Sequence, residues 1–174
     1  MQSELKESVQ VQAETALLAA QKLLAPWGTQ QTETRRIKVT GNGRADSPLV
    51  FIQPDNLPNA IQVLMDANWG YLITITGLDL GTEAGDMEVL YHFAAGAAVV
   101  TLCVRVGKEP AVIPSICSII PSASFFEREL SEMLGITVQN PPNTDRLFLP
   151  DNWPTGVYPL RKEFAAEGSP SSDC

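Results

Sequence analysis

The first periodic pattern in the chain is helical. Apolar residues recur every three or four positions over about residues 4–25, and the shared face carries Val9, Ala13, Ala16, Leu17, Ala20, Leu23 and Leu24. Pro26 and Gly28 follow directly, and both residue types commonly end helices. The pattern therefore predicts an N-terminal helix with one apolar side.

Beyond this helix the pattern changes to alternation. Apolar and polar residues alternate over about 34–40, which favours a strand, and the sequence GNGRADSP at 41–48 is typical of a turn-rich loop. A short strand is predicted over 49–53. A second helix then begins with a capping Asp or Asn at position 55 or 56 and runs to about residue 67.

Three strand-like runs come next, over residues 71–80, 87–93 and 97–106, and short glycine-containing turns join them. Short turns between strands indicate an antiparallel meander. Together with the helices, the runs predict an α+β fold. We expect a mostly antiparallel sheet of four to five strands with helices on one face.

The last predicted helix covers residues 123–134. A linker over 107–121, which contains three prolines, precedes it. Gly135 stands at the position where a glycine often ends a helix. Ser124 and Glu127 have the spacing of a capping box, in which the two side chains bind the free N–H groups of the first turn.

Residues 136–164 fit neither a core element nor a solvated linker. Prolines interrupt any helix or central strand at positions 141, 142, 150, 154 and 159. The segment is nevertheless rich in large apolar residues, and apolar surface left in water forgoes about 25 cal/mol per Å². We therefore expect a domain over 1–135 and an extended, proline-rich C-terminal arm over 136–174 that wraps a partner subunit.

Composition restricts the partners. The formal net charge of −8 and the pI of about 4.6 argue against nucleic acid, because no basic stripe is present. The three cysteines are widely spaced and form no CxxC pair, which indicates reduced thiols in a cytosolic setting and gives no metal or iron–sulfur ligand set.

The sequence predicts neither secretion nor insertion into a membrane. The first residues lack the pattern of a secretory signal, and the most apolar window is shorter than the roughly 20 residues that span a bilayer. A soluble protein that meets a membrane only through partner subunits is expected.

The candidate chemistry lies in the helix at 123–134, which contains Glu127, Arg128 and Glu129. Glu129 borders the apolar side, so an arm cation should neutralise it or Glu127; the candidates are Arg146, Arg161 and Lys162. Arg128 is spaced to pair with Glu132 on the outer side. A solvated charged face is the simpler alternative.

A catalytic role is a further alternative, with Glu127 and Glu129 as an acid–base pair. The single histidine, His92, lies in a predicted strand and is better explained as a packed or surface residue. No motif for a nucleophile, a phosphate loop or a zinc protease occurs. We therefore expect no catalytic, cofactor-binding or metal-binding residue in this chain.

The arm carries its own candidate contacts. Trp153 is the best interface anchor, because buried tryptophans often dominate contact energy. The run Tyr158, Pro159, Leu160, Arg161 and Lys162 alternates in a way that suits extended backbone lying along a partner.

These C-terminal motifs together resemble a known family. FERELSEMLGI followed by DRLFLPDNWPTGVYPLRKEF is similar to the C subunit of respiratory complex I and to its counterpart in membrane-bound, energy-converting nickel–iron hydrogenases. The family pattern has an ERExxD helix, a turn with glycine and isoleucine, an Arg–aliphatic–Leu–Pro run and a closing PLRKDF. The resemblance covers about residues 60–164.

The resemblance implies a subunit that binds no cofactor of its own. It implies packing on a large subunit, called D in complex I or the nickel–iron large subunit in hydrogenases, and on a small iron–sulfur subunit. Those partners would carry iron–sulfur clusters and FMN or a nickel–iron centre, on the cytoplasmic side of the cell membrane. Electron transfer in them would be coupled to ion translocation.

Several positions depart from the complex I pattern. Glu132 replaces the aspartate of ERExxD, Asn140-Pro141-Pro142 replaces Gly-His-Pro, and Glu163 replaces the closing aspartate. These differences resemble hydrogenase-type members somewhat more than NADH-oxidising ones, and both types stay open. A free-standing protein-binding module without a redox role is the alternative from another class.

Overall fold

The computed structural model describes residues 2–38, 44–81 and 85–164, with side chains described over 7–29, 48–81 and 85–164. Its helices are α1 (Gln2–Leu24), the short 3-10 helix η1 (Pro54–Asn56), α2 (Leu57–Asp66) and α3 (Ala123–Leu134). Its strands are β1 (Gly28–Lys38), β2 (Arg44–Ile52), β3 (Tyr71–Asp79), β4 (Asp86–Ala95), β5 (Ala98–Gly107), β6 (Val112–Pro114) and β7 (Thr137–Gln139).

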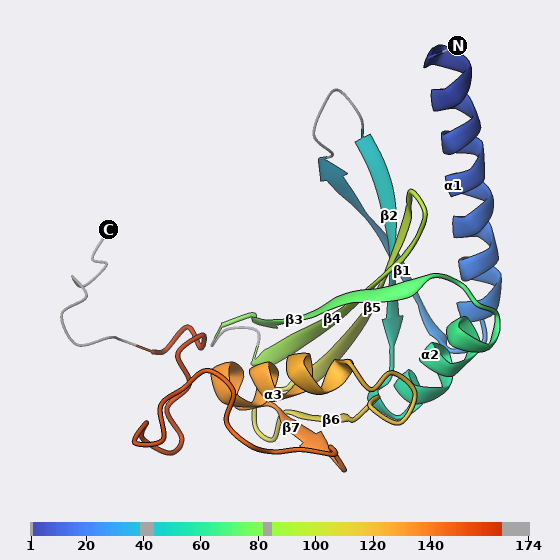
Figure 1. Cartoon of the computed structure of the whole chain (residues 1–174). Coiled ribbons are helices and arrows are strands. Elements are labelled where there is room, and N and C mark those ends of the chain that lie inside the picture. The colour runs from blue at the N-terminus through green and yellow to red at the C-terminus, as the bar shows by residue number, and fades with distance from the viewer. Residues whose placement is uncertain (1, 39–43, 82–84, 165–174) are drawn as a thin grey trace.

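Five strands form the main sheet, in the order β1-β2-β5-β4-β3 (Figure 1). Strands β3, β4 and β5 form the predicted antiparallel meander, and β1 pairs with β2 in the same sense. The pair β2–β5 is parallel, because η1, α2, β3 and β4 intervene before the chain returns beside β2. The predicted α+β class is confirmed, with a mixed sheet that is antiparallel at three of its four pairings.

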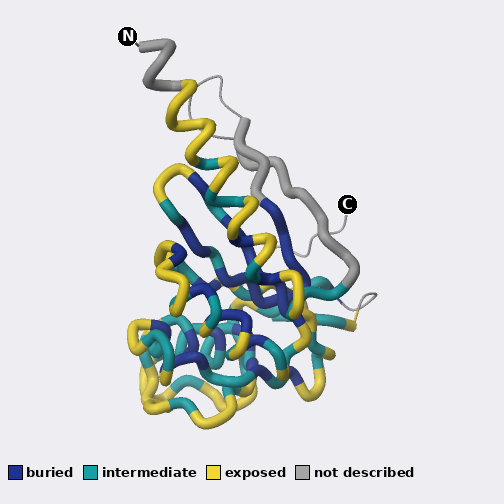
Figure 2. Tube along the Cα trace, turned by 90° about the vertical axis from the view of Figure 1, so that its right-hand side faces the viewer, coloured by how far each residue is buried: buried dark blue, intermediate teal, exposed yellow. Residues whose placement is uncertain are grey.

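The helices cover one face of this sheet. Leu130 and Leu134 of α3 lie in the same buried cluster as Ile61 of α2 and Leu24 of α1. The sheet side of the cluster consists of Val50, Ile52, Ile75, Met87, Val89, Tyr91, Phe93, Ala98, Val100, Leu102 and Val104. Figure 2 shows this buried interior, from which the N-terminal half of the described α1 extends with mostly exposed residues.

Two predicted boundaries differ from the structure. Strand β1 begins at Gly28, well before the predicted start, because its first residues are polar and give no alternation signal. Residues 44–48 of the predicted loop belong to β2, while positions 41–43 lie outside the described residues. The sequence of that loop is rich in turn-forming residues, so pairing with β1 overrides local propensity here.

The linker before α3 also contains structure that the sequence did not reveal. Strand β6 lies within it and pairs in parallel with β7, which follows α3. Ile113 faces Val138 across this pair, and the Ser115 N–H donates to the Gln139 carbonyl at 3.0 Å. The chain on the two sides of α3 is therefore joined, which fixes where the C-terminal segment starts.

Residues 140–164 contain neither helix nor strand and lie beside α3 (Figure 1). The irregular conformation agrees with the proline spacing. Their burial is intermediate to exposed, so they do not enter the core of the domain. Contact of this segment with a second polypeptide stays a prediction.

Candidate functional site

Glu127 points from α3 into the domain and is only 2% exposed. Its carboxylate accepts hydrogen bonds from the Ser115 hydroxyl (2.8 Å), the Ile116 backbone N–H (2.7 Å) and the Cys117 thiol (3.1 Å). All three donors lie in the loop after β6, so one carboxylate fixes that loop against α3. The predicted capping box is wrong, since no side-chain hydrogen bond caps the start of α3.

The outer side of α3 holds the irregular segment. Arg128 donates two hydrogen bonds, each of 2.7 Å, to the carbonyls of residues 145–146. Glu132 accepts hydrogen bonds of 2.6 and 2.8 Å from the N–H groups of residues 147–148. The predicted ion pair between Arg128 and Glu132 is wrong, because each side chain binds the backbone of the segment instead.

Arg146 and Trp153 close a turn within the segment. The Arg146 guanidinium donates to the carbonyls of Pro150 (2.6 Å) and Trp153 (3.1 Å). The Trp153 indole N–H donates to the Val157 carbonyl at 2.9 Å, and its ring centroid lies 6.3 Å from that of Phe164. Both side chains thus make defined contacts within their own chain, and a partner contact by Trp153 stays a prediction.

Residues 158–164, which we call the strap, begin with Tyr158 packed on the end of α3. Gly135 ends the helix with a φ of +70°, as its position in the sequence predicted. The Tyr158 ring lies so close that a Cβ atom on Gly135 would stand 2.4 Å from it. The Arg161 guanidinium covers Tyr158, 4.6 Å from the ring centroid. Glycine is therefore required at position 135 for two reasons: it adopts the positive φ, and it leaves room for the Tyr158 ring.

The strap also satisfies carbonyl groups that the end of a helix leaves free. The Leu160 N–H donates to the Met133 carbonyl at 3.0 Å, and Arg161 Nε donates to the Leu134 carbonyl at 2.8 Å. Pro159 is half-buried between these contacts, whereas the Leu160 side chain is 58% exposed. The backbone of the strap is fastened to α3, and one large apolar side chain is left facing outward.

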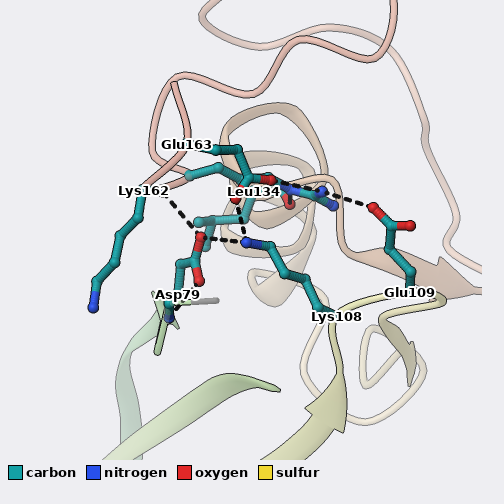
Figure 3. Close-up of polar contacts among 8 residues, drawn as sticks. Asp79, Lys108, Glu109, Leu134, Lys162 and Glu163 are labelled. Carbon is teal, nitrogen blue, oxygen red and sulfur yellow. Dashed lines mark hydrogen bonds and ion pairs between the residues drawn. The ribbon is translucent and has the colours of Figure 1, made fainter. Parts of the chain in front are cut away.

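A second fastening point lies at the end of β3 (Figure 3). Asp79 accepts hydrogen bonds from the N–H groups of Gly81 (2.8 Å) and Lys162 (2.9 Å). The Lys108 ammonium lies 3.2 Å from Asp79 and also pairs with Glu163. One buried carboxylate thereby holds the backbone of the strap and a lysine from the end of β5.

The side chains of the strap differ in what they contact. Arg161 Nη1 lies 3.6 Å from Glu109 and 3.5 Å from Glu163, which completes the charged network of Figure 3. The Lys162 side chain points away from this network, so Lys162 contributes its backbone N–H to it. Arg161 is therefore an internal clamp, while the Lys162 ammonium stays exposed.

The electrostatics of Asp79 follow from these contacts. Burial alone would raise the pKa of the carboxyl, but the hydrogen bonds from Lys162, Gly81 and Lys108 outweigh it and hold the pKa below its ordinary value of 3.8. The hydrogen bond to Glu163, followed by that to Asp79, raises the pKa of Lys108. Asp79 and Lys108 are therefore both charged at neutral pH.

Attachment of the strap is expected to weaken in acid. Because the pKa of Asp79 is lower in the folded state, its stabilisation is complete above about pH 4 and is lost as pH falls through the lower, folded-state pKa. Urea unfolding of wild type and Asp79→Asn at pH 7 and pH 2.5 measures this effect. The difference in free energy of unfolding between the two proteins should be smaller at pH 2.5. Asp55→Asn, at an exposed site, is the matched control, and an unchanged gap for Asp79→Asn would contradict the role of the carboxylate.

The structure corrects the predicted pairing of arm cations with helix carboxylates. Arg146, Arg161 and Lys162 do not contact Glu127, which is fully engaged by the loop after β6. Within the described part of the chain, Glu129 makes no hydrogen bond or ion pair. The segment and α3 are instead joined by hydrogen bonds between side chains and backbone groups. Side chains of α3 bind the backbone of the segment, and the Arg161 side chain binds the backbone of α3.

The structure does not bring Glu127 and Glu129 together as an acid–base pair. Residues two apart on a helix do not face each other, and Glu127 is buried while Glu129 is not. His92 is half-buried, with Nδ1 2.9 Å from the Thr101 hydroxyl. Over the described ranges, no three His, Cys, Asp or Glu residues gather as a possible metal site.

No helix within the described residues has both the length and the apolar character needed to cross a bilayer.

Sequence reasoning missed Asp79, Lys108 and Ser115. A signal existed for Asp79, because Asp two positions before Gly81 is typical of a turn in which the carboxylate binds the following backbone. Ser115 similarly accepts from the Cys117 N–H at 3.2 Å. Their contacts with α3 and the strap span long stretches of sequence, so local patterns could not reveal them.

The α+β fold described above also occurs in solved structures. A chain of an archaeal respiratory membrane complex, the membrane-bound sulfane sulfur reductase, superimposes with a TM-score of 0.67 and 19% identity. The superposition covers 87% of this chain and 86% of that one.

The family is shown by sequence. The model of the family described as "Respiratory-chain NADH dehydrogenase, 30 Kd subunit" matches residues 50–170, so the chain belongs to this family. The resemblance stated from the motifs is thereby confirmed. The match begins near the end of β2 and includes α3 and the strap.

Relatives come from two kinds of complex. The C subunit of the NADH-quinone oxidoreductase of Ruegeria pomeroyi is 34% identical over 123 residues, covering 68% of this chain and 60% of that protein. Formate hydrogenlyase subunit 5 of Escherichia coli is 31% identical over 121 residues, covering 68% of this chain but only 21% of that protein. The chain therefore spans about a fifth of the length of the second relative.

Proposed function

We propose that this chain is a non-catalytic scaffold subunit in the peripheral arm of a membrane-attached, complex I-type oxidoreductase. It packs on a large subunit, of the D type or the nickel–iron type, and on a small iron–sulfur subunit. Those partners carry the iron–sulfur clusters together with FMN or a nickel–iron centre. The chain reaches the cytoplasmic side of the membrane through them and supports electron transfer coupled to ion translocation.

The observation that carries this proposal is the family match over residues 50–170, which spans the whole fastened segment. That segment has no regular structure, yet α3 and Asp79 hold its backbone in one conformation. Such a segment presents a fixed surface, and a fixed surface loses little conformational entropy when a partner binds. The relatives from quinone oxidoreductases and hydrogenases favour a redox complex of one of these two types.

Purification from native membranes tests the proposal. An affinity-tagged chain, isolated after mild detergent extraction, is expected to retain a large subunit and an iron–sulfur subunit in equimolar amounts. The iron content and visible absorption of the complex should be far above those of the isolated chain. The sequence of the co-purified large subunit separates the two types, because two CxxC motifs that ligate nickel indicate a hydrogenase and their loss indicates a quinone reductase.

The proposal is contradicted if the tagged chain emerges from native membranes without any iron–sulfur protein. Stable recovery with a partner that lacks redox cofactors supports the alternative of a binding module without a redox role. Turnover of a redox substrate by the isolated, metal-free chain would overturn the scaffold role itself.

A further inference from the structure

Two large apolar side chains in the C-terminal segment stay exposed although their backbones are held. Phe148 is 61% exposed and Leu160 is 58% exposed. The Phe148 N–H donates to the Glu132 carboxylate at 2.8 Å, and the Leu160 N–H donates to the Met133 carbonyl at 3.0 Å. Glu132 and Met133 are consecutive, so one turn of α3 positions both exposed side chains.

The anchors around this pair are strong for an irregular segment. Glu132 is charged and binds two consecutive N–H groups, and hydrogen bonds to charged groups are about twice as strong as neutral ones. Arg161 binds the Leu134 carbonyl one residue further along the helix. The two apolar side chains are therefore presented from an ordered backbone, which is the arrangement that favours tight contact.

Three other large side chains of the segment are turned to their own chain. Arg146 binds two carbonyls of the segment, Trp153 binds Val157, and Arg161 binds the end of α3. We infer that Phe148 and Leu160, rather than Trp153 or Arg161, are the side chains that enter the partner subunit. The inference deepens the proposed function and rests on it.

Charge selects the occupant of this surface. Asp145 and Asp151 flank Phe148 three positions away on each side, both exposed, and neither forms an ion pair within the described ranges. The whole chain carries −8, so a second copy and an anionic lipid surface are both repelled. The occupant is a protein subunit with two apolar recesses bordered by Lys or Arg side chains, as complementary interfaces require.

The test uses matched serine substitutions in the native complex. Leu160→Ser and Phe148→Ser remove the two proposed contacts, and Leu18→Ser removes an equally exposed leucine of α1, at 58%. Each tagged variant replaces the chromosomal copy, and the complex is isolated from membranes. The readout is the amount of co-purified large subunit per tagged chain, with circular dichroism and thermal unfolding of the purified chain as checks on folding.

The single substitutions are expected to lower the ratio of large subunit to tagged chain several-fold, and the double variant by about tenfold or more, as for residues at the centre of an interface. Leu18→Ser should leave the ratio unchanged, and all variants should unfold like wild type. A double variant that assembles as well as Leu18→Ser overturns the inference while leaving the proposed function intact. A wild-type chain that brings down no redox subunit refutes the proposed function instead.

Discussion

Gly135→Ala is expected to destabilise the chain and to release the strap. A residue with a side chain is strained at the φ of +70° found here, at a cost of about 1–2 kcal/mol. The new Cβ atom would also stand 2.4 Å from the Tyr158 ring, so the ring must leave its seat. The Arg161 guanidinium lies on this ring, so displacement of the ring exposes the peptide bond after Arg161 to trypsin. Urea unfolding measures the first effect, and the rate of trypsin cleavage at Arg161 measures the second.

Gly96→Ala is the matched control for this prediction. Gly96 has a φ of +60°, and no atom lies within 4 Å of the position that a Cβ would take, so it shares the backbone strain without the clash. We expect backbone strain to lower the free energy of unfolding by a similar amount in both variants. Only Gly135→Ala should lose further stability and be cleaved faster by trypsin. Equal stability and equal cleavage in the two variants would show that Tyr158 is not seated against the end of α3.

The fold follows from local signals, which is why the sequence predicts it well. Helix α3 occupies 123–134 as its periodicity indicates, and β3 covers 71–79 against a predicted 71–80. Both elements carry a strong apolar period and clear end signals. The start of β1 at Gly28 could not be predicted in this way, because polar residues there are paired by a strand that comes later in the sequence.

The site is harder to predict, because its contacts are long-range. The helical pattern placed Glu129 at the border of the apolar face, whereas the structure buries Glu127, two positions earlier in the helix. What decides between the two is the loop at 115–117, which offers three donors to the buried carboxylate. No periodic signal within α3 records those donors.

The charged residues of the family motif also have a use that a partner contact alone would not predict. Arg128, Glu132 and Arg161 each form hydrogen bonds with backbone groups of the same chain. Buried backbone groups need hydrogen-bond partners, and this irregular segment obtains several of them from side chains of α3. The charged motif residues therefore shape the segment, and under the proposed function the contact with another subunit is left to the side chains that stay exposed.

Glu127→Leu is expected to have the largest effect on folding. The substitution leaves the half-buried Ser115 hydroxyl and the buried Ile116 N–H without their acceptor, and an unsatisfied buried group costs about 1–3 kcal/mol. The Cys117 thiol also loses its acceptor; burial raises its pKa to about 11, so it stays a protonated donor at neutral pH. We expect a loss of about 3 kcal/mol or more in the free energy of unfolding, measured by urea titration.

Glu129→Leu, two residues along the same helix, is the control, because Glu129 has no hydrogen bond within the described chain; its effect should stay within about 0.5 kcal/mol. A double-mutant cycle then isolates the contact with Ser115. Once Glu127 is replaced by leucine, Ser115→Ala no longer removes a hydrogen bond to that carboxylate, so its cost should fall to what the Cys117 N–H loses when its Ser115 acceptor is removed. Additive costs in the cycle would mean that Glu127 does not bind the loop through the Ser115 hydroxyl.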